Sequence, residues 1–521
     1  MKRLSAALGS ALLASCATPA VVPADADLLI RGGMVYPGGG EPFIGDVAIA
    51  SDRVIAAGPS LSVRAARTIE ASGMIVAPGF IDPHTHMTDW LTSNDAGRRL
   101  VEPFLLQGVT TALVGNDGGG PIAVGELLAS AREKAVGINY AAFTGFGTIR
   151  EAVIGEARRA PTPKELDQER ALVRRAMCEG ALGLSTGLFY APQSFSETPE
   201  VVALARVAGE MGGVYDSHLR DEANYTVGLA TAVGEALEIA RDARVPVHIS
   251  HIKALGVDVQ GQAPKIIAAI EAARREGLDV TASQYPWDAS GTSLTAALVP
   301  LWAQDSGRAA LLARLDDPAL SAKLRGEIAE NMRRRGGASS LLIVEDRWKG
   351  RRLDAVASEL GTDTVSAAIA AIREADSRTV SFNMTESDIA AFMRQPWTMT
   401  DSDASPGHPR VYGSFARKYA VYVKERKTLT LREFIDRSST LAADWYGLEG
   451  RGRLRAGSLA DVVVFDPQSY AARATYEQPE LTAVGVRAVV VNGRLAVEGG
   501  KLTRAAAGRA LAKAPPAGMC Q

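Results

Sequence analysis

The middle of this 521-residue chain alternates short strand-like runs with helical runs from about residue 80 to residue 440. The strand candidates are residues 110–115, 140–143, 181–185, 213–218, 246–251, 280–285 and 398–401. Helical stretches such as 163–179 and 226–242 lie between them, and Thr162 with Glu165 forms a capping-box sequence. Repeated strand-then-helix units favour a parallel sheet, and about eight of them predict a (β/α)₈ TIM barrel over residues 80–440.

The two ends of the chain have a different texture. Residues 25–80 and 450–505 contain short strands separated by glycine and proline, which predicts one small β-sandwich domain built from both ends. Residues of about 300–350 break the alternation within the barrel region. There we expect a mostly helical insertion over the barrel mouth, which would shape the substrate pocket.

The first 20 residues have the composition of an export signal. Lys2 and Arg3 precede a short apolar stretch, which is too short for a stable membrane span. The following Leu-Ala-Ser-Cys16 resembles a bacterial lipobox, in which Cys16 becomes the lipidated first residue; ordinary signal-peptidase cleavage near Ala17 or Ala20 is the alternative. We therefore expect a periplasmic or outer-membrane-anchored bacterial lipoprotein, with membrane contact only through that anchor.

Composition excludes one class of partner and offers few cross-links. The formal net charge is -2 and no basic face is evident, so we expect no nucleic-acid binding. Beyond Cys16 the chain has only Cys178, expected to be a small buried apolar residue, and Cys520, in a tail expected to be loose. Two such cysteines predict no disulfide framework.

Five of the six histidines fall in three short runs. His84 and His86 form a His-x-His pair, and His218 and His251 each end a later strand candidate. A His-x-His pair on a strand places both imidazoles on one face, because side chains alternate. With an aspartate nearby they predict a site for Zn²⁺ or a similar ion, and such an ion activates water, which predicts a hydrolase.

Two residues close to this pattern need separate treatment. His248 lies three residues before His251, so alternation points it to the opposite face, where we expect packing or a hydrogen bond. Asp403 is the candidate general base, which takes a proton from water and passes it to the leaving amine. Asp401 shares its strand face by the same alternation and is the alternative base.

Ordered runs along the whole mature chain carry a family resemblance. They are His84-Thr85-His86, Gly108 to Thr111, Gly180 to Leu188, Ser217 to Glu222, Ile249 to Lys253, Gln284 to Pro286, Ser402-Asp403, His408 to Gly413 and Gly457 to Val462. With these runs the chain resembles the amidohydrolase superfamily, and within it the D-aminoacylases (N-acyl-D-amino-acid deacylases). The resemblance implies hydrolysis of N-acyl-D-amino acids, the D configuration included, and places the base at Asp403, which is also counted among the metal ligands.

One departure from that family pattern concerns the metal site. The family has a metal-bridging cysteine after its second strand, where this chain has Asp117. A carboxylate can also bridge two cations, so Asp117 with His218 and His251 is expected to form a second metal site beside His84 and His86. An oxygen ligand weakens the preference for zinc, so one or two Zn²⁺ ions are expected, with Mn²⁺ or Co²⁺ as alternatives.

Four residues are candidates for binding the small-molecule substrate. Arg410 can bind both oxygens of a carboxylate, and Lys253 shares the face of His251. Tyr190 and Tyr285 are expected to line the pocket or polarise the scissile carbonyl. His408 is read as part of the Arg410 loop and not as a ligand.

Two alternative functions stay open at this point. A dipeptidase or cyclic-amide hydrolase of the same superfamily is the nearer one. Several of those enzymes bridge their metals with a carboxylated lysine on the fourth strand, and residues 181–185 contain no lysine. The other is a non-catalytic lipoprotein that binds small molecules, which the complete set of ligand candidates disfavours.

Overall fold

Eight parallel strands form the barrel that the alternation predicts, in a computed structural model that describes residues 25–520. They are β6 (Phe80–Thr85), β7 (Val109–Val114), β8 (Asn139–Ala142) with its continuation β9 (Thr144–Gly145), β10 (Gly183–Gly187), β11 (Val214–His218), β12 (Val247–Ile249), β13 (Val280–Gln284) and β17 (Thr398–Thr400). One parallel sheet runs β6-β7-β8 and the other β9-β10-β11-β12-β13-β17. A parallel bridge between Thr85 and Ala404, just after β17, joins the two ends of the ring. The signal-like segment 1–20, with Cys16, lies outside the described residues.

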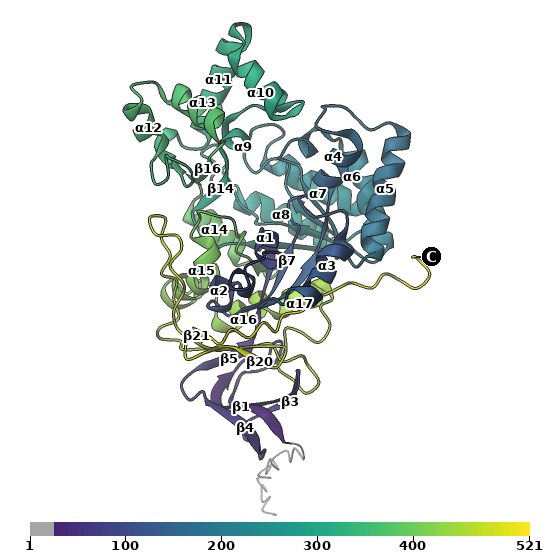
Figure 1. The fold of residues 1–521 in the computed structure, drawn as a ribbon, viewed down its shortest axis with the longest axis vertical. Helices are drawn as coiled ribbons and strands as arrows, with labels where there is room; N and C mark the ends of the chain where they lie inside the picture. The colour runs from purple at the N-terminus through teal and green to yellow at the C-terminus, as the bar shows by residue number, and fades with distance from the viewer. Residues whose placement is uncertain (1–24, 521) are drawn as a thin grey trace, which may run out of the picture.

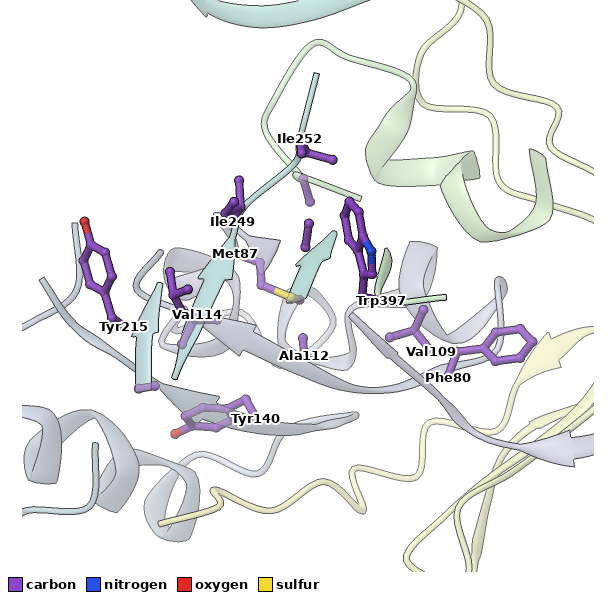
Figure 2. Packing of buried hydrophobic residues seen from close by; sticks show 14 of the residues in the cluster. Phe80, Met87, Val109, Ala112, Val114, Tyr140, Tyr215, Ile249, Ile252 and Trp397 are labelled. Carbon is purple, nitrogen blue, oxygen red and sulfur yellow. The ribbon is translucent and has the colours of Figure 1, made fainter. Parts of the chain in front are cut away.

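The barrel strands are buried on both faces, as parallel strands covered by helices must be. The helices are α3 (Val124–Glu133), α4 (Phe146–Ile154), α5 (Pro163–Cys178), α6 (Thr198–Glu210), α7 (Leu229–Ala243), α8 (Ala263–Arg275), α14 (Glu386–Met393), α16 (Leu431–Ser438) and α17 (Thr440–Tyr446). Helix α5 begins with the capping box expected at Thr162 and Glu165. Figure 2 shows part of the core, where Val114, Ile249 and Trp397 lie among side chains from several strands.

Strands from both chain ends pair into one nine-stranded sheet below the barrel (Figure 1). They are β1 (Ala26–Val35), β2 (Phe43–Ala50), β3 (Arg53–Gly58), β4 (Ala65–Glu70), β5 (Ile75–Pro78), β18 (Val462–Phe465), β19 (Val486–Val491), β20 (Arg494–Glu498) and β21 (Lys501–Leu502). The two halves share one hydrophobic cluster, in which Val47 and Val54 lie with Val462 and Val490. Both ends are needed because neither half alone covers its apolar face.

An insertion between β13 and β17 stands over the barrel (Figure 1). Its antiparallel sheet contains β14 (Ala289–Ser293), β15 (Leu341–Ile343) and β16 (Arg378–Phe382), and its helices are α9 (Leu294–Leu298), α10 (Gly307–Asp316), α11 (Pro318–Arg334), α12 (Leu353–Glu359) and α13 (Thr364–Glu374). It has its own hydrophobic cluster. The insertion therefore extends beyond the expected 300–350 and includes a sheet. Strand β14 was hard to predict because Ala-Ser-Gly-Thr-Ser lacks apolar alternation.

Within residues 25–520 no single helix has the length and apolar character needed to cross a membrane, although α12 and α13, bent by 95°, meet that test as a pair.

The C-terminal tail is fixed to the barrel, contrary to expectation. The backbone N–H of Leu511 donates to the carbonyl of Tyr140, and the N–H of Lys513 donates to the carbonyl of Gly180. Cys520 forms a disulfide with Cys178 at the end of α5, across a separation of 342 residues. The expectations of a free buried Cys178 and a loose tail were therefore wrong, because a pairing over that distance leaves no local sequence signal.

We predict that Cys178→Ser lowers the free energy of unfolding by about 2–4 kcal/mol, because the cross-link restricts the unfolded chain. Thermal melts with and without reductant measure this effect. Cys520→Ser is the matched control: it should be destabilised equally, and reductant should change neither variant. Peptide mapping that finds both cysteines as free thiols in the purified native protein would contradict the pairing.

Candidate metal centre at the barrel mouth

The six residues predicted as metal ligands meet at the carboxyl ends of the barrel strands. His84 lies in β6 and His86 directly after it, Asp117 follows β7, and His218 ends β11. His251 and Asp403 lie in the turns after β12 and β17. The parallel ring brings these strand ends together, which is where TIM barrels carry their sites. Their assignment as ligands stays a prediction that the geometry supports.

Asp117 occupies the centre of this group. Its Oδ1 lies 3.4 Å from Nε2 of His84 and 3.5 Å from Nε2 of His251. Its Oδ2 lies 3.5 Å from Nε2 of His86 and 3.4 Å from Nδ1 of His218. Each oxygen therefore faces one histidine from each expected ion site. A carboxylate between both pairs of histidines could serve both expected ions, so this geometry supports the bridging role predicted for Asp117.

The donor set fits one or two divalent cations. Donor atoms of His84, His86 and Asp117 form one cluster with metal-site spacing, and those of Asp117, His218 and His251 form another. Ligands at 2.0–2.2 Å around a tetrahedral ion lie about 3.3–3.6 Å apart, which matches the distances around Asp117. Among the described residues, Nε2 of His84 and Oδ1 of Asp117 are buried at the centre of this group without a hydrogen-bond partner. Buried polar atoms need partners, and a cation supplies them.

Two members of the cluster, His84 and Asp117, have the charge state that a metal ligand requires. Burial lowers the pKa of His84 to about 4, which keeps the imidazole neutral and its lone pair available. Burial acts to raise the pKa of Asp117, but His84, His218 and His251 outweigh it and hold the pKa well below its usual value. Asp117 is therefore ionised at neutral pH, as a ligand must be.

Left-handed backbone at three positions aims side chains into the site. Asp117, His251 and Asp403 have φ angles of 56°, 37° and 45°. Residues other than glycine rarely adopt this region, and such strain clusters at functional sites. Strand alternation predicted that Asp401 and Asp403 share one face, but β17 ends at Thr400 and both residues lie in the turn after it. In that turn Asp403 lines the cavity next to the ligand cluster, whereas Asp401 is fully buried.

A layer of buried polar groups holds the ligand strands from below. Oδ1 of Asp82 accepts the N–H of Ser402 at 3.1 Å, which ties β6 to the turn carrying Asp403. Oδ1 of Asp216 accepts hydrogen bonds from Oγ of Ser250 at 2.9 Å and from Nδ2 of Asn116 at 3.3 Å. These bonds fix the strand ends relative to one another, as outer groups commonly do for metal ligands.

The ligand cluster opens into a cavity of about 500 Å³. The four predicted substrate-binding residues, Tyr190, Lys253, Tyr285 and Arg410, all line it. The hydroxyl of Tyr285 is buried without a hydrogen-bond partner among the described residues, so it can donate to a substrate oxygen. Nη1 of Arg410 lies 2.6 Å from Oδ2 of Asp403, and its Nε has no partner within residues 25–520.

Sequence reasoning missed the role of Glu222. Its Oε1 lies 2.5 Å from Nζ of Lys253 and 3.2 Å from Nδ1 of His251. Burial acts to raise the pKa of Glu222, but Lys253 and both histidines lower it below its usual value. Lys253 is therefore already paired with Glu222. Besides lining the cavity, its Nζ contacts Nδ1 of His251 and helps to orient that ring. In the sequence, the one indication of this role was that Glu222 lies four residues after His218.

The two remaining histidines are not part of the cluster, as expected. Nδ1 of His248 lies 2.9 Å from Oγ1 of Thr281, and the ring packs near Trp445 and Tyr446. Nε2 of His408 lies 3.0 Å from the carbonyl of Ala289, and its Nδ1 accepts the N–H of Arg410. His408 thus shapes the loop that carries Arg410.

Comparisons with known proteins agree with this layout. The model of the amidohydrolase family matches residues 67–497. D-aminoacylase of Alcaligenes xylosoxydans xylosoxydans is 32% identical over 515 residues, which cover 94% of this chain and 98% of that protein. The chain therefore belongs to the amidohydrolase family.

Two solved structures are similar over nearly the whole chain. A D-aminoacylase studied for its binuclear metal centre has a TM-score of 0.80 and 30% identity, covering 94% of this chain and all of that one. N-acyl-D-glutamate deacylase of Bordetella bronchiseptica, complexed with zinc and a phosphonate that mimics the tetrahedral intermediate, has a TM-score of 0.79 and 29% identity with the same coverage.

We predict that Asp117 sets the metal preference. Asp117→Cys should still bind metal but should shift the preference from Mn²⁺ or Co²⁺ towards Zn²⁺, because thiolate is the softer ligand. Asp117→Ala should bind fewer metal ions per chain, because both clusters lose the ligand that they share. Metal analysis after dialysis against each ion measures both effects. Full metal content in Asp117→Ala would contradict the central position.

Proposed function

We propose that this chain is a metal-dependent hydrolase that cleaves the amide bond of N-acyl-D-amino acids, releasing a carboxylic acid and a D-amino acid. The observation that carries the proposal is the position of Asp117, which faces all four histidines within 3.5 Å. Relatives that act on N-acyl-D-amino acids match over nearly the full chain, which supports the substrate class.

The metal would be held by His84, His86, Asp117, His218, His251 and Asp403, whose donor atoms form three overlapping clusters. When bound, a divalent cation supplies Lewis acidity, which polarises a carbonyl and makes water a better nucleophile at neutral pH. Two zinc ions, or Mn²⁺ or Co²⁺, fit this mixed nitrogen and oxygen donor set.

Asp403 is the proton carrier in this proposal. Its Oδ1 lies 3.2 Å from Nε2 of His86, and its Oδ2 is paired with Arg410. Burial acts to raise the pKa of Asp403, but Arg410 and nearby histidines hold it well below its usual value. The carboxylate is therefore ionised before the reaction, accepts a proton from the attacking water and delivers it to the leaving amine.

The remaining cavity residues position the substrate. Arg410 has a free Nε for one oxygen of the α-carboxylate, and Tyr285 offers its hydroxyl beside it. The ring of Tyr285 lies 5.0 Å from the guanidinium of Arg410, which keeps these two donors together. Tyr190 also lines the cavity, with its ring 4.9 Å from that of His218.

Export is the second part of the proposal. The lipobox-like Leu-Ala-Ser-Cys16 supports a lipid anchor on Cys16. The disulfide between Cys178 and Cys520 supports an oxidising compartment, because such bonds are rare in the cytosol.

Turnover of a substrate panel tests the function. We expect hydrolysis of N-acetyl-D-amino acids with added Zn²⁺, Mn²⁺ or Co²⁺, little hydrolysis of the L-enantiomers, and loss of activity after chelation that returns with metal. A metal-loaded protein that cleaves only dipeptides or cyclic amides would favour the related hydrolases. One that cleaves no amide would favour a binding protein.

The same assay separates the two aspartates. Asp403→Asn should lower kcat by about 10²–10⁴-fold while metal stays bound, because the proton carrier is removed. Asp401→Asn is the matched control. Asp401 is buried outside the cavity and burial raises its pKa to about 6, so we expect its variant to keep most of the turnover. The reverse outcome would assign the base to Asp401.

Labelling with a radioactive fatty acid in a bacterial host tests the anchor. We expect label on the wild-type chain, none on Cys16→Ser, and membrane association only for the labelled form. If neither the wild type nor Cys16→Ser carries label and both are found in the same cell fraction, ordinary cleavage near Ala17 or Ala20 is the processing route.

A further inference from the structure

Two arginines from the insertion line the reaction cavity without an acidic partner. Arg335 follows α11, and Arg378 begins β16. The other two basic residues of the cavity are neutralised, Lys253 by Glu222 and Arg410 by Asp403. Within residues 25–520 no carboxylate lies within ion-pairing distance of Arg335 or Arg378. The insertion therefore adds positive charge to the cavity that the protein itself does not balance.

Arg335 is the more buried of these two arginines, and hydrogen bonds hold its guanidinium in place. It is 2% exposed, its Nε donates to the carbonyl of Ala297 at 3.3 Å, and its Nη1 donates to Oγ of Ser381 at 3.0 Å. The guanidinium also lies 5.5 Å from the ring of Tyr225, another cavity residue. These neutral partners orient the group but leave its charge intact. A buried charge without a counter-charge is costly, so an anion that enters the cavity is favoured there.

Arg378 approaches the cavity from the other face of β14. The antiparallel register pairs Ser290 with Ser381 and Ser293 with Arg378, so alternation places Ser381 and Arg378 on opposite faces. Ser290, Thr292 and Ser293 also line the cavity, which makes this edge a wall of hydroxyl and guanidinium donors. Donors of this kind match a carboxylate better than an apolar side chain.

The charge balance leaves room for a second anion. Of the four acidic residues that line the cavity, Asp117 faces the histidines, Glu222 and Asp403 are paired, and Asp89 is exposed. A bound cation adds further positive charge. Because Asp403 and Glu222 already neutralise Arg410 and Lys253, the single negative charge of the α-carboxylate leaves at least one of Arg335 and Arg378 without a counter-charge.

Resting on the function proposed above, we propose that the preferred substrates are N-acyl-D-amino acids with a second carboxylate, which the uncompensated positive charge of Arg335 and Arg378 stabilises in the cavity. That carboxylate belongs either to the amino-acid side chain or to the acyl group, and both sources present the same chemistry to the two arginines.

Matched substrate pairs test the proposal and separate the two sources. N-acetyl-D-glutamate against N-acetyl-D-glutamine tests the side chain, and N-succinyl-D-alanine against N-butyryl-D-alanine tests the acyl group. We expect the dianionic member of at least one pair to have a kcat/KM about 10-fold or more above its neutral counterpart. In Arg335→Gln and Arg378→Gln most of that advantage should be lost, a fall of about 10-fold, while turnover of the neutral substrate changes little.

Arg334→Gln is the matched control. Arg334 is the neighbour of Arg335 but pairs with Glu330 and lies outside the cavity lining, so its loss should leave the ratio unchanged. Thermal melts check that each variant is folded, and Arg378, which is less buried, covers the case in which Arg335→Gln does not fold.

Two results would overturn the inference. One is a wild-type protein whose kcat/KM is the same for the dianionic and the neutral member in both pairs. The other is a dianion preference that survives in folded Arg378→Gln and Arg335→Gln. In either case N-acyl-D-amino acids are still cleaved and the proposed function stands. Failure of every N-acyl-D-amino acid in the wild type would instead remove the proposed function itself.

Discussion

The placement of one carboxylate among four imidazoles organises this molecule. Asp117 is only 12% exposed, yet each of its oxygens faces two histidines at 3.4–3.5 Å. Positive charge at its centre stabilises an arrangement of this kind, because it gives a partner to buried acceptors and lone pairs. The ends of β6, β7, β11 and β12 must converge to build it, and a closed parallel ring achieves that convergence.

Around this centre, charges are matched locally. Glu222 neutralises Lys253, and Asp403 neutralises Arg410, so both of these basic cavity residues have an acidic neighbour. The insertion departs from this rule with Arg335 and Arg378. In the proposals made above, the barrel supplies the metal ligands and the proton carrier, while the insertion that covers it supplies the charge that distinguishes substrates. This division agrees with the general tendency of enzymes to vary specificity through segments attached to a constant scaffold.

Much of the fold could be predicted from the sequence. The seven strand candidates coincide within a few residues with β7, β8, β10, β11, β12, β13 and β17, because buried parallel strands are short apolar runs between helices. The capping box at Thr162 was equally clear, since its signal is local. Strand β14 was missed because it is polar, and the bond between Cys178 and Cys520 was missed because 342 residues separate its ends.

For the site, the sequence by itself determined which donor groups are available to bind metal, since His-x-His on a strand places two imidazoles on one face. Tertiary structure decided what those residues do together. The left-handed turns at Asp117, His251 and Asp403 aim each side chain, override strand alternation and separate Asp403 from Asp401. Only the folded chain brings Glu222 against Lys253 and leaves Arg335 without a counter-charge. The reason is physical: ligand type is a property of a residue, whereas charge compensation depends on distances between segments that are remote in the chain.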